Sequence, residues 1–352
     1  MSAIQSYTPQ QAKAFALDIL KAIHVPDAEA EIIAESLLQA DLRGVKSHGL
    51  IRLPAYIRRI EAKVMNPVKN IQVIQDSGST ALIDANNTFG PLAGHAAMTK
   101  AIEKAKEFGA GMVAVRNSNH FGVSAYYTMM AADQDMIGIV MTNAAPALAP
   151  FGAKTALMGT NPVSVTIPAD EEPALVLDMS STLVARGKIR YAATTHQDIP
   201  LGWALDPEGK PTADPEAALK GTLEPIGGPK GSGLALMIEI LCSLLTGTGF
   251  LGEVRETTDL NGPMKTGHLF CAFEIARFTD PKAFKKEIDR CVRLIKSLPS
   301  ISGGPIYLPG EIEYLNVLKN QKDGLAYDGE VVASLNQLAA SLGVKALPVK
   351  EA

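Results

Sequence analysis

The sequence predicts an α/β fold of the α+β kind, in which a mixed sheet lies between helical segments from the two ends of the chain. Helical periodicity dominates roughly the first 65 residues and returns near the C-terminus. From Val68 onward, short apolar runs alternate with helical patterns. A turn signal at residues 76–79 separates two such runs and predicts a hairpin, which excludes an all-parallel sheet.

Three helices are expected before Val68. Residues 8–11 supply an N-cap threonine, a proline at the first helical position and a capping-box glutamine, so a helix should begin there and run to residue 23. A second helix is expected over residues 27–42, and Gly44 should end it. A third helix should follow with Pro54 in its first turn or at a kink, which places the segment before it in an interhelix loop.

The centre of the chain should supply the sheet and the helices that cover it. Apolar runs bounded by turn residues predict strands at 71–75, 80–84, 112–115, 137–142, 163–167, 175–177 and 269–273. Amphipathic spacing predicts helices at 91–108, 123–132, 183–189, 232–246 and 281–298.

Helices at 311–321 and 329–342 should close the chain and pack against the N-terminal helices. We therefore expect a helical domain formed by residues 1–67 and 306–352, and an α/β domain formed by residues 68–305. With 352 residues, the chain is long enough for two cores.

Composition excludes several classes of function. Thirty-three basic and 37 acidic residues give a net charge of -4 without long runs of either sign, which argues against a nucleic-acid or acidic-membrane partner. Three distant cysteines and scattered histidines predict neither a disulfide framework nor a metal site. The N-terminus does not resemble a secretory signal, and no apolar run approaches the roughly 20 residues of a membrane span. We expect a cytoplasmic protein.

The segment at residues 43–52 concentrates groups suited to acid/base chemistry on an anion. His48 has a side chain whose ordinary pKa lies near neutrality, and Arg43 or Arg52 can hold a carboxylate in a two-pronged contact. The spacing alone is equally consistent with Ser47 as a helix cap, a buried structural histidine and a solvated arginine.

Other polar clusters follow predicted strands, where site residues often lie in α/β proteins. They are residues 117–122 with His120, the turn at 159–162, and residues 178–182 beginning with Asp178. Each cluster is also compatible with an ordinary turn or helix cap.

A glycine-rich loop at residues 227–233 contains Lys230 and leads into a helix, which would suit a phosphate or a plain turn. The dinucleotide motif G-x-G-x-x-G, the P-loop and the G-x-S-x-G elbow of serine hydrolases are all missing from the sequence.

Taken together, the motifs resemble the malate/L-lactate dehydrogenase family of the non-Rossmann type. They occur in the family's order at residues 43–49 with Arg52, and at 117–122, 150–152, 159–162, 178–180, 185–188, 228–231 and 308–311. The strings at 40–44, 134–138 and 309–313 are most similar to the archaeal sulfolactate/malate branch. Ile312, where many malate dehydrogenases of the family carry arginine, and Lys46 depart from the common pattern and bear on substrate and cofactor preference.

The resemblance implies a largely antiparallel sheet that binds a dinucleotide without the Rossmann arrangement, and a helical domain made from both chain ends. It also implies a homodimer and an active site in the cleft between the domains. The reaction would be hydride transfer between NAD or NADP and the C2 atom of a small 2-hydroxy acid, with malate or sulfolactate as the first candidates.

The site residues follow from the resemblance and from the chemistry of their side chains. His48 would carry the proton, with His120 as its rival, and Ser47 and Asp178 would orient or polarise the imidazole. Arg52 would hold the C1 carboxylate, and Arg43 or Lys46 would meet a second anionic group. Further substrate contacts are assigned to Thr160 and Asn161. The cofactor is expected to contact His120, Asp178, Met179, Ser180, Thr182, Pro229, Lys230, Gly310, Glu311 and Ile312.

Two alternatives stay open. The first is a reductase of another substrate class on the same fold, acting on ureidoglycolate, diketogulonate, lactate or a cyclic imine carboxylate. The second is a binding protein without activity, which the reactive side chains disfavour.

Overall fold

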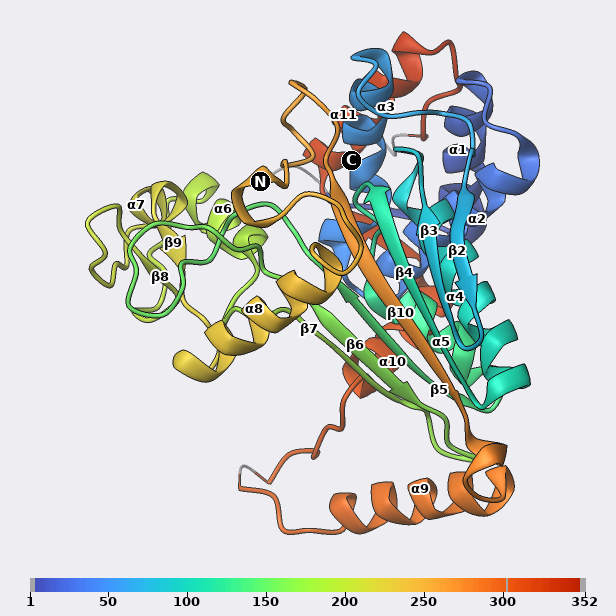
Figure 1. Cartoon of the computed structure of the whole chain (residues 1–352). Coiled ribbons are helices and arrows are strands. Elements are labelled where there is room, and N and C mark those ends of the chain that lie inside the picture. Colours follow the sequence, from blue (N-terminus) through green and yellow to red (C-terminus); the bar gives the residue numbers. More distant parts are fainter. Residues whose placement is uncertain (1–3, 302, 349–352) are drawn as a thin grey trace.

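The structure is a computed structural model that describes residues 4–301 and 303–348. Its centre is a seven-stranded sheet with the order β2-β3-β4-β10-β5-β6-β7 (Figure 1). The strands are β2 (Gln72–Ser77), β3 (Thr80–Asp84), β4 (Ala110–Ser118), β5 (Met136–Thr142), β6 (Val163–Ile167), β7 (Leu175–Met179) and β10 (Thr266–Glu274). The pair β3 and β4 is parallel, and all other neighbours in this sheet are antiparallel. The predictions of a mixed, largely antiparallel sheet and of the β2–β3 hairpin are therefore confirmed.

Helices cover both faces of the sheet. Helices α4 (Gly90–Phe108) and α5 (Ser124–Ala132) pack on one face, and α8 (Pro229–Cys242) crosses the other (Figure 1). The central strand β10 shows why both faces of the sheet need a helical cover. Phe270 belongs to the same apolar cluster as the α4 side chains, whereas Leu269 packs with Ile238 of α8. Since successive side chains of a strand point to opposite faces, both faces of β10 are buried.

The N-terminal helices α1 (Pro9–Ala22), α2 (Asp27–Leu42) and α3 (Leu53–Glu61) share one apolar core with α11 (Gly329–Ser341). Strand β1 (Gln5–Tyr7) pairs antiparallel with β11 (Leu325–Tyr327) and joins these segments. The predicted capping box is present, because the Thr8 hydroxyl accepts from the Gln11 amide N–H at 3.1 Å. The two ends of the described chain thus pack together, while the domain boundaries at 67 and 306 stay predictions.

Several elements were not predicted or begin elsewhere. Strands β8 (Ala204–Leu205) and β9 (Thr222–Leu223) and helix α7 (Pro215–Lys220) are too short for periodicity to reveal. Helix α6 spans Arg186–Thr194 instead of 183–189, because the hydroxyls of Ser180 and Thr182 hydrogen bond within the preceding turn. Short 3-10 turns are formed at Lys46–His48, Leu50–Arg52, Leu251–Glu253 and Ile275–Arg277.

Two helices complete the fold. Helix α9 (Pro281–Lys296) lies at the far end of the sheet from the N-terminal helices, and α10 (Glu311–Asp323) returns the chain toward them (Figure 1). The Asn320 side chain on α10 donates to the Leu42 carbonyl at the end of α2 at 2.9 Å. In the described residues, no helix has the length and apolar character needed to cross a membrane.

Candidate active site

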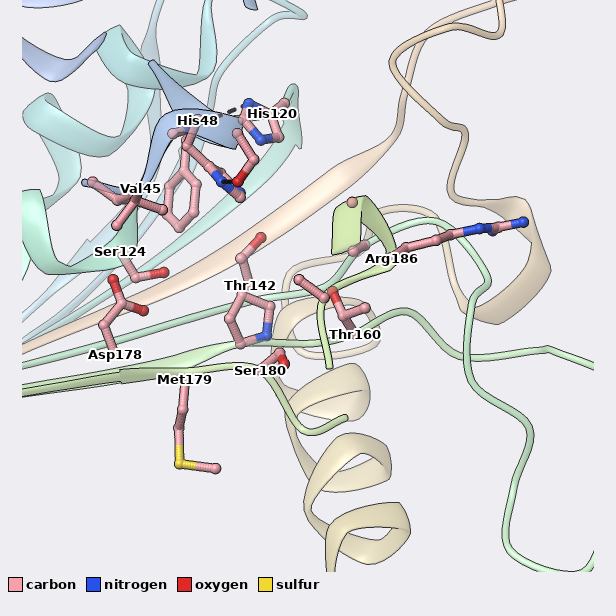
Figure 2. A pocket seen from close by; sticks show the side chains of 18 of the residues that line it. Val45, His48, His120, Ser124, Thr142, Thr160, Asp178, Met179, Ser180 and Arg186 are labelled. Carbon is pink, nitrogen blue, oxygen red and sulfur yellow. Dashed lines mark hydrogen bonds between the residues drawn. The ribbon is translucent and has the colours of Figure 1, made fainter. Parts of the chain in front are cut away.

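A pocket of about 580 Å³ lies where the N-terminal helices meet the sheet (Figure 2). Its lining comes from segments far apart in the sequence: the turn between α2 and α3, the ends of β4 and β7, the start of α6, and the start of α10. Its polar and charged lining, with Met179 and Gly310, includes Arg43, Ser47, His48, Arg52, His120, Thr160, Asp178, Ser180, Arg186, Arg190, Arg255, Glu256 and Glu313. Most of the motifs recognised in the sequence therefore meet in one cavity.

The turn that carries His48 is fixed from behind by a buried carboxylate. Asp41, near the end of α2, accepts a hydrogen bond from the Leu50 amide at 2.9 Å and from the Tyr327 hydroxyl at 2.7 Å. A Cβ atom at Gly49 would lie 1.8 Å from the Asp41 carboxylate, so the turn requires glycine there. Burial raises the pKa of Asp41 to about 6. The turn is thus tied both to α2 and to the C-terminal strand β11.

We expect Asp41→Ala to destabilise the protein by about 1–3 kcal/mol for each donor left unpaired, the Leu50 amide and the Tyr327 hydroxyl. It should also lower kcat/KM, because His48 loses its support. Asp41→Asn, which keeps an oxygen acceptor, is the matched control and should retain most of the stability. Urea unfolding and steady-state kinetics measure the two effects. Equal stability of wild type and Asp41→Ala would show that the contacts contribute nothing.

Two histidines lie side by side in the pocket. The rings of His48 and His120 stack with centroids 5.2 Å apart and planes inclined by 28° (Figure 2). The His48 Nδ1 atom lies 2.8 Å from the Ser47 hydroxyl, and the His120 Nδ1 atom lies 2.8 Å from the Tyr56 hydroxyl. Each ring is therefore held through Nδ1, and we infer that Nε2 is the nitrogen that each offers to a ligand.

Both imidazoles are electrically neutral near pH 7. Burial, followed by the positive charge of Arg52, lowers the pKa of His48 to about 3. Burial also lowers the pKa of His120 well below its ordinary value, with further contributions from Arg52 and His48. A neutral imidazole can accept a proton, so either ring is a candidate base.

Arg52 is placed for a carboxylate beside these rings. Its Nε atom donates to the Ser47 carbonyl at 2.6 Å, which fixes the plane of the guanidinium next to His48. Burial lowers the pKa of Arg52, and the positive charge of Arg190 lowers it further. A fixed guanidinium in a low-dielectric pocket is the arrangement that grips a planar anion.

The other two predicted cations lie differently. Arg43 is buried, contacts the Met129 sulfur at 3.4 Å, and lies near Asp178 and Glu313, whose charges offset its desolvation. Lys46 is exposed and is not among the residues that line the pocket. Arg43 therefore belongs to an acidic corner of the pocket, whereas Lys46 is an exposed residue outside the pocket lining.

Asp178 does not orient His48 in the structure. Its carboxylate accepts from the Ala125 amide at 2.8 Å, and Figure 2 shows it beside Ser124, apart from the two rings. Burial raises its pKa to about 6. Within the described residues, Ser47 and Tyr56 are the side chains that hydrogen bond the pocket imidazoles.

Thr160 and Asn161 were both predicted as substrate contacts, but their side chains lie in different surroundings. Thr160 lines the pocket (Figure 2). The Asn161 side chain instead points into the protein: it accepts from the Ala144 amide at 3.1 Å and donates to the Glu239 carboxylate at 2.8 Å. Asn161 is fully buried with a φ of 33°, so it shapes the turn and does not face a ligand. Asparagine also stabilises strained turns, which accounts for this residue type at this position.

The residues predicted to contact the cofactor fall into two groups, those that line the pocket and those that do not. Met179, Ser180 and Gly310 line the pocket, and a Cβ at Gly310 would lie 2.6 Å from Val176. His120 and Asp178 line it as well, whereas the other five predicted residues lie outside the lining. Thr182 bonds within its own turn, Pro229 and Lys230 begin α8, Glu311 pairs with Lys296, and Ile312 is 51% exposed.

Some site residues were missed by sequence reasoning. Tyr56 lies one helical turn after Arg52, a spacing that could have revealed it. No sequence motif marks His268, but it is fully buried in β10 and its ring stacks on that of Phe121 with centroids 4.4 Å apart. Its Nδ1 atom lies 2.6 Å from the Thr142 hydroxyl, so it supports two residues of the pocket wall. Only the tertiary fold places His268 there.

The comparisons with known proteins agree with this geometry. A family model described as Malate/L-lactate dehydrogenase matches residues 7–336. The Malate/(S)-sulfolactate dehydrogenase of Methanothermus fervidus is 39% identical over 338 residues, which are 96% of this chain and 98% of that protein. The solved sulfolactate dehydrogenase of Methanocaldococcus jannaschii has a TM-score of 0.91 at 39% identity and covers 97% of this chain and 98% of its own.

The chain therefore belongs to the malate/L-lactate dehydrogenase family. It is an oxidoreductase, a dehydrogenase of 2-hydroxy acids that works with a nicotinamide cofactor. One relative is the (2R)-3-sulfolactate dehydrogenase (NADP(+)) of Chromohalobacter salexigens, whose name specifies NADP(+). This relative is 38% identical over 77% of this chain and 81% of its own length. The name of the ureidoglycolate dehydrogenase of Escherichia coli specifies NAD(+). This protein is 31% identical over 89% of this chain and 88% of its own length.

Proposed function

We propose that the chain interconverts a 2-hydroxy acid and the matching 2-oxo acid at the His48 turn, with malate/oxaloacetate or sulfolactate/sulfopyruvate as the substrate pair. The observation that carries the proposal is the joint placement of a neutral imidazole and a fixed guanidinium on one short turn. The first would exchange a proton with the C2 oxygen, and the second would hold the C1 carboxylate.

The proton would move through His48. In oxidation, the neutral His48 Nε2 accepts the proton of the substrate hydroxyl, while the Ser47 hydroxyl holds the ring through Nδ1. In reduction, the same atom returns the proton to the carbonyl oxygen. A carboxylate bound at Arg52 offsets the positive charge that lowers the pKa of His48, so substrate binding itself favours the protonated imidazole. His120, stacked on it, is the alternative proton carrier.

The pocket residues fit a nicotinamide dinucleotide. The wall near Asp178 is apolar, with Val176, Leu177 and Pro309, and Glu313 completes an acidic corner there. Carboxylates bind ribose hydroxyls well, and apolar walls suit an aromatic ring. When bound, the cofactor supplies or accepts the hydride. Asp178, Met179, Ser180 and Gly310 would hold it, and Lys230 at the start of α8 would reach a phosphate.

A panel of 2-oxo acids tests the proposal. Oxaloacetate, sulfopyruvate, pyruvate and diketogulonate are each assayed by absorbance with NADH and with NADPH, and ureidoglycolate is assayed in the oxidative direction. We expect turnover with oxaloacetate or sulfopyruvate, and the panel decides between the two cofactors. Turnover confined to pyruvate, diketogulonate or ureidoglycolate would favour the alternative substrate class, and no turnover with any compound would contradict a dehydrogenase.

We also propose that the chain forms a homodimer. Large apolar side chains are exposed on α8 and α10, namely Met237, Ile312, Tyr314, Leu315 and Leu318. Exposed apolar surface of this kind marks contact surfaces between protein chains. Sedimentation equilibrium should give twice the 37.3 kDa mass of the chain, and a monomer at micromolar concentration would contradict the proposal.

A further inference from the structure

A second group of charged residues lies in the same pocket and takes no part in the proton chemistry. Arg186 and Arg190 lie one turn apart on α6, and both pair with Glu256, at 3.2 Å and 3.5 Å. Arg255, next to Glu256, pairs with Asp259 at 2.7 Å. All but Asp259 line the pocket that contains His48 and Arg52.

Helix α3 links this group of charged residues to the turn that carries His48. Arg59 is fully buried on α3 and donates to three backbone carbonyls, those of Glu256, Asp259 and Gly262. Arg52 immediately precedes the same helix as its N-cap residue. Helix α3 therefore holds both Arg52, the proposed ligand of the carboxylate, and the segment that carries Glu256. The spacing between Arg52 and the α6 arginines is thus set by the fold.

The two α6 arginines differ in how far their hydrogen-bonding groups are used. The Arg186 side chain points out of the pocket centre (Figure 2) and bonds Glu256, the Leu219 carbonyl at 2.9 Å and the Pro146 carbonyl at 3.4 Å. Arg190 reaches Glu256 through one terminal nitrogen at 3.5 Å, and its side chain is 53% exposed. Arg190 thus keeps donors for a ligand, whereas Arg186 is engaged in holding the loop.

The charges of Arg52 and Arg190 act on each other. The positive charge of Arg190 is one of the causes that lower the pKa of Arg52. Two cations that line one pocket and repel each other favour a ligand with two negative charges. Arg43 also lines the pocket but lies near Asp178 and Glu313, and Lys46 is exposed and outside the lining.

We propose that Arg190 forms a second anion subsite opposite Arg52, which selects 2-hydroxy and 2-oxo acids that carry a further carboxylate or sulfonate. Arg186 and Glu256 position Arg190, and Glu256 is its counterion in the absence of substrate. This inference rests on the proposed function, since Arg52 must hold the C1 carboxylate for Arg190 to meet the other end.

The kinetic test compares a dianionic and a monoanionic substrate of similar size, oxaloacetate and 2-oxobutyrate. Wild type should prefer oxaloacetate in kcat/KM. Arg190→Gln should reduce this preference by about 10- to 100-fold, the range expected for hydrogen bonds to a charged group, mainly through the KM of oxaloacetate. Arg190→Lys should restore part of it. Arg290→Gln, which removes an exposed arginine on the distant helix α9, is the matched control.

A binding test is independent of turnover. Succinate and butyrate are added separately to wild type and to Arg190→Gln, and the thermal unfolding temperature is measured. Succinate should stabilise wild type more than butyrate does, and the difference should vanish in the variant. The inference is overturned if Arg190→Gln keeps the preference for dianions, or if it slows both substrates equally. A wild-type protein that reduces no 2-oxo acid overturns the proposed function, and the subsite with it.

Discussion

Replacing His48 with asparagine should lower kcat by about 10²- to 10⁴-fold, the usual contribution of a general acid or base. Asparagine keeps a polar side chain in the turn but cannot exchange a proton with the substrate. The Asp41 anchor of the turn acts through the Leu50 amide and does not involve the His48 side chain, so the fold should persist. Cofactor affinity, measured by fluorescence titration, should change little, because His48 is not among the residues proposed to hold the cofactor.

His120→Asn is the matched variant, since its ring stacks on His48 and is equally buried. We expect a smaller loss there. Full turnover in His48→Asn together with an inactive His120→Asn would transfer the proton role to His120. The pH profile adds a second criterion. Because the pKa of His48 is lowered to about 3, kcat/KM for oxidation should show no acid limb from this residue between about pH 5 and 8.

Replacing Arg52 with glutamine should cost about 2–5 kcal/mol of transition-state stabilisation, or roughly 30- to 4,000-fold in kcat/KM. Glutamine cannot form the two-pronged, charged contact with a carboxylate, and the substrate C2 atom would lose its alignment with His48. Steady-state kinetics with oxaloacetate at saturating cofactor measures the loss. Arg52→Lys keeps the charge without the fork, and it should recover only part of the activity.

The Arg52 side chain also donates to the Ser47 carbonyl, so its loss could loosen the turn. Thermal unfolding of Arg52→Gln separates the two effects, because a simple loss of substrate binding leaves the unfolding temperature nearly unchanged. An unaltered kcat/KM in this variant would mean that the C1 carboxylate binds elsewhere in the pocket.

Much of the fold could be predicted, because its elements are long and carry strong local signals. The capping box at Thr8, the left-handed Gly44 that follows α2, and the β2–β3 hairpin were each expected from the residues themselves. The β1–β11 pair was not. Its strands have three residues each and are separated by more than three hundred positions, so no local pattern marks them.

The site was predicted less completely for a related reason. Motifs identify which residue types gather, but the direction of each side chain depends on tertiary contacts. Asn161 and Asp178 have the chemistry of ligand-binding groups, yet one points into the interior and the other bonds a backbone amide. Arg190 stands in a sequence without any special pattern, and only the placement of α6 beside the pocket shows its significance.

The hydrogen bond between Asp41 and Tyr327 spans 286 positions of the chain. During translation, a growing polypeptide therefore has the His48 turn long before it has the strand that secures it. Contacts of such long range slow folding, because a large loop must close before they form. Nascent chains shorter than 327 residues would lack this tie, so the enzyme should gain full activity only after residue 327 has left the ribosome.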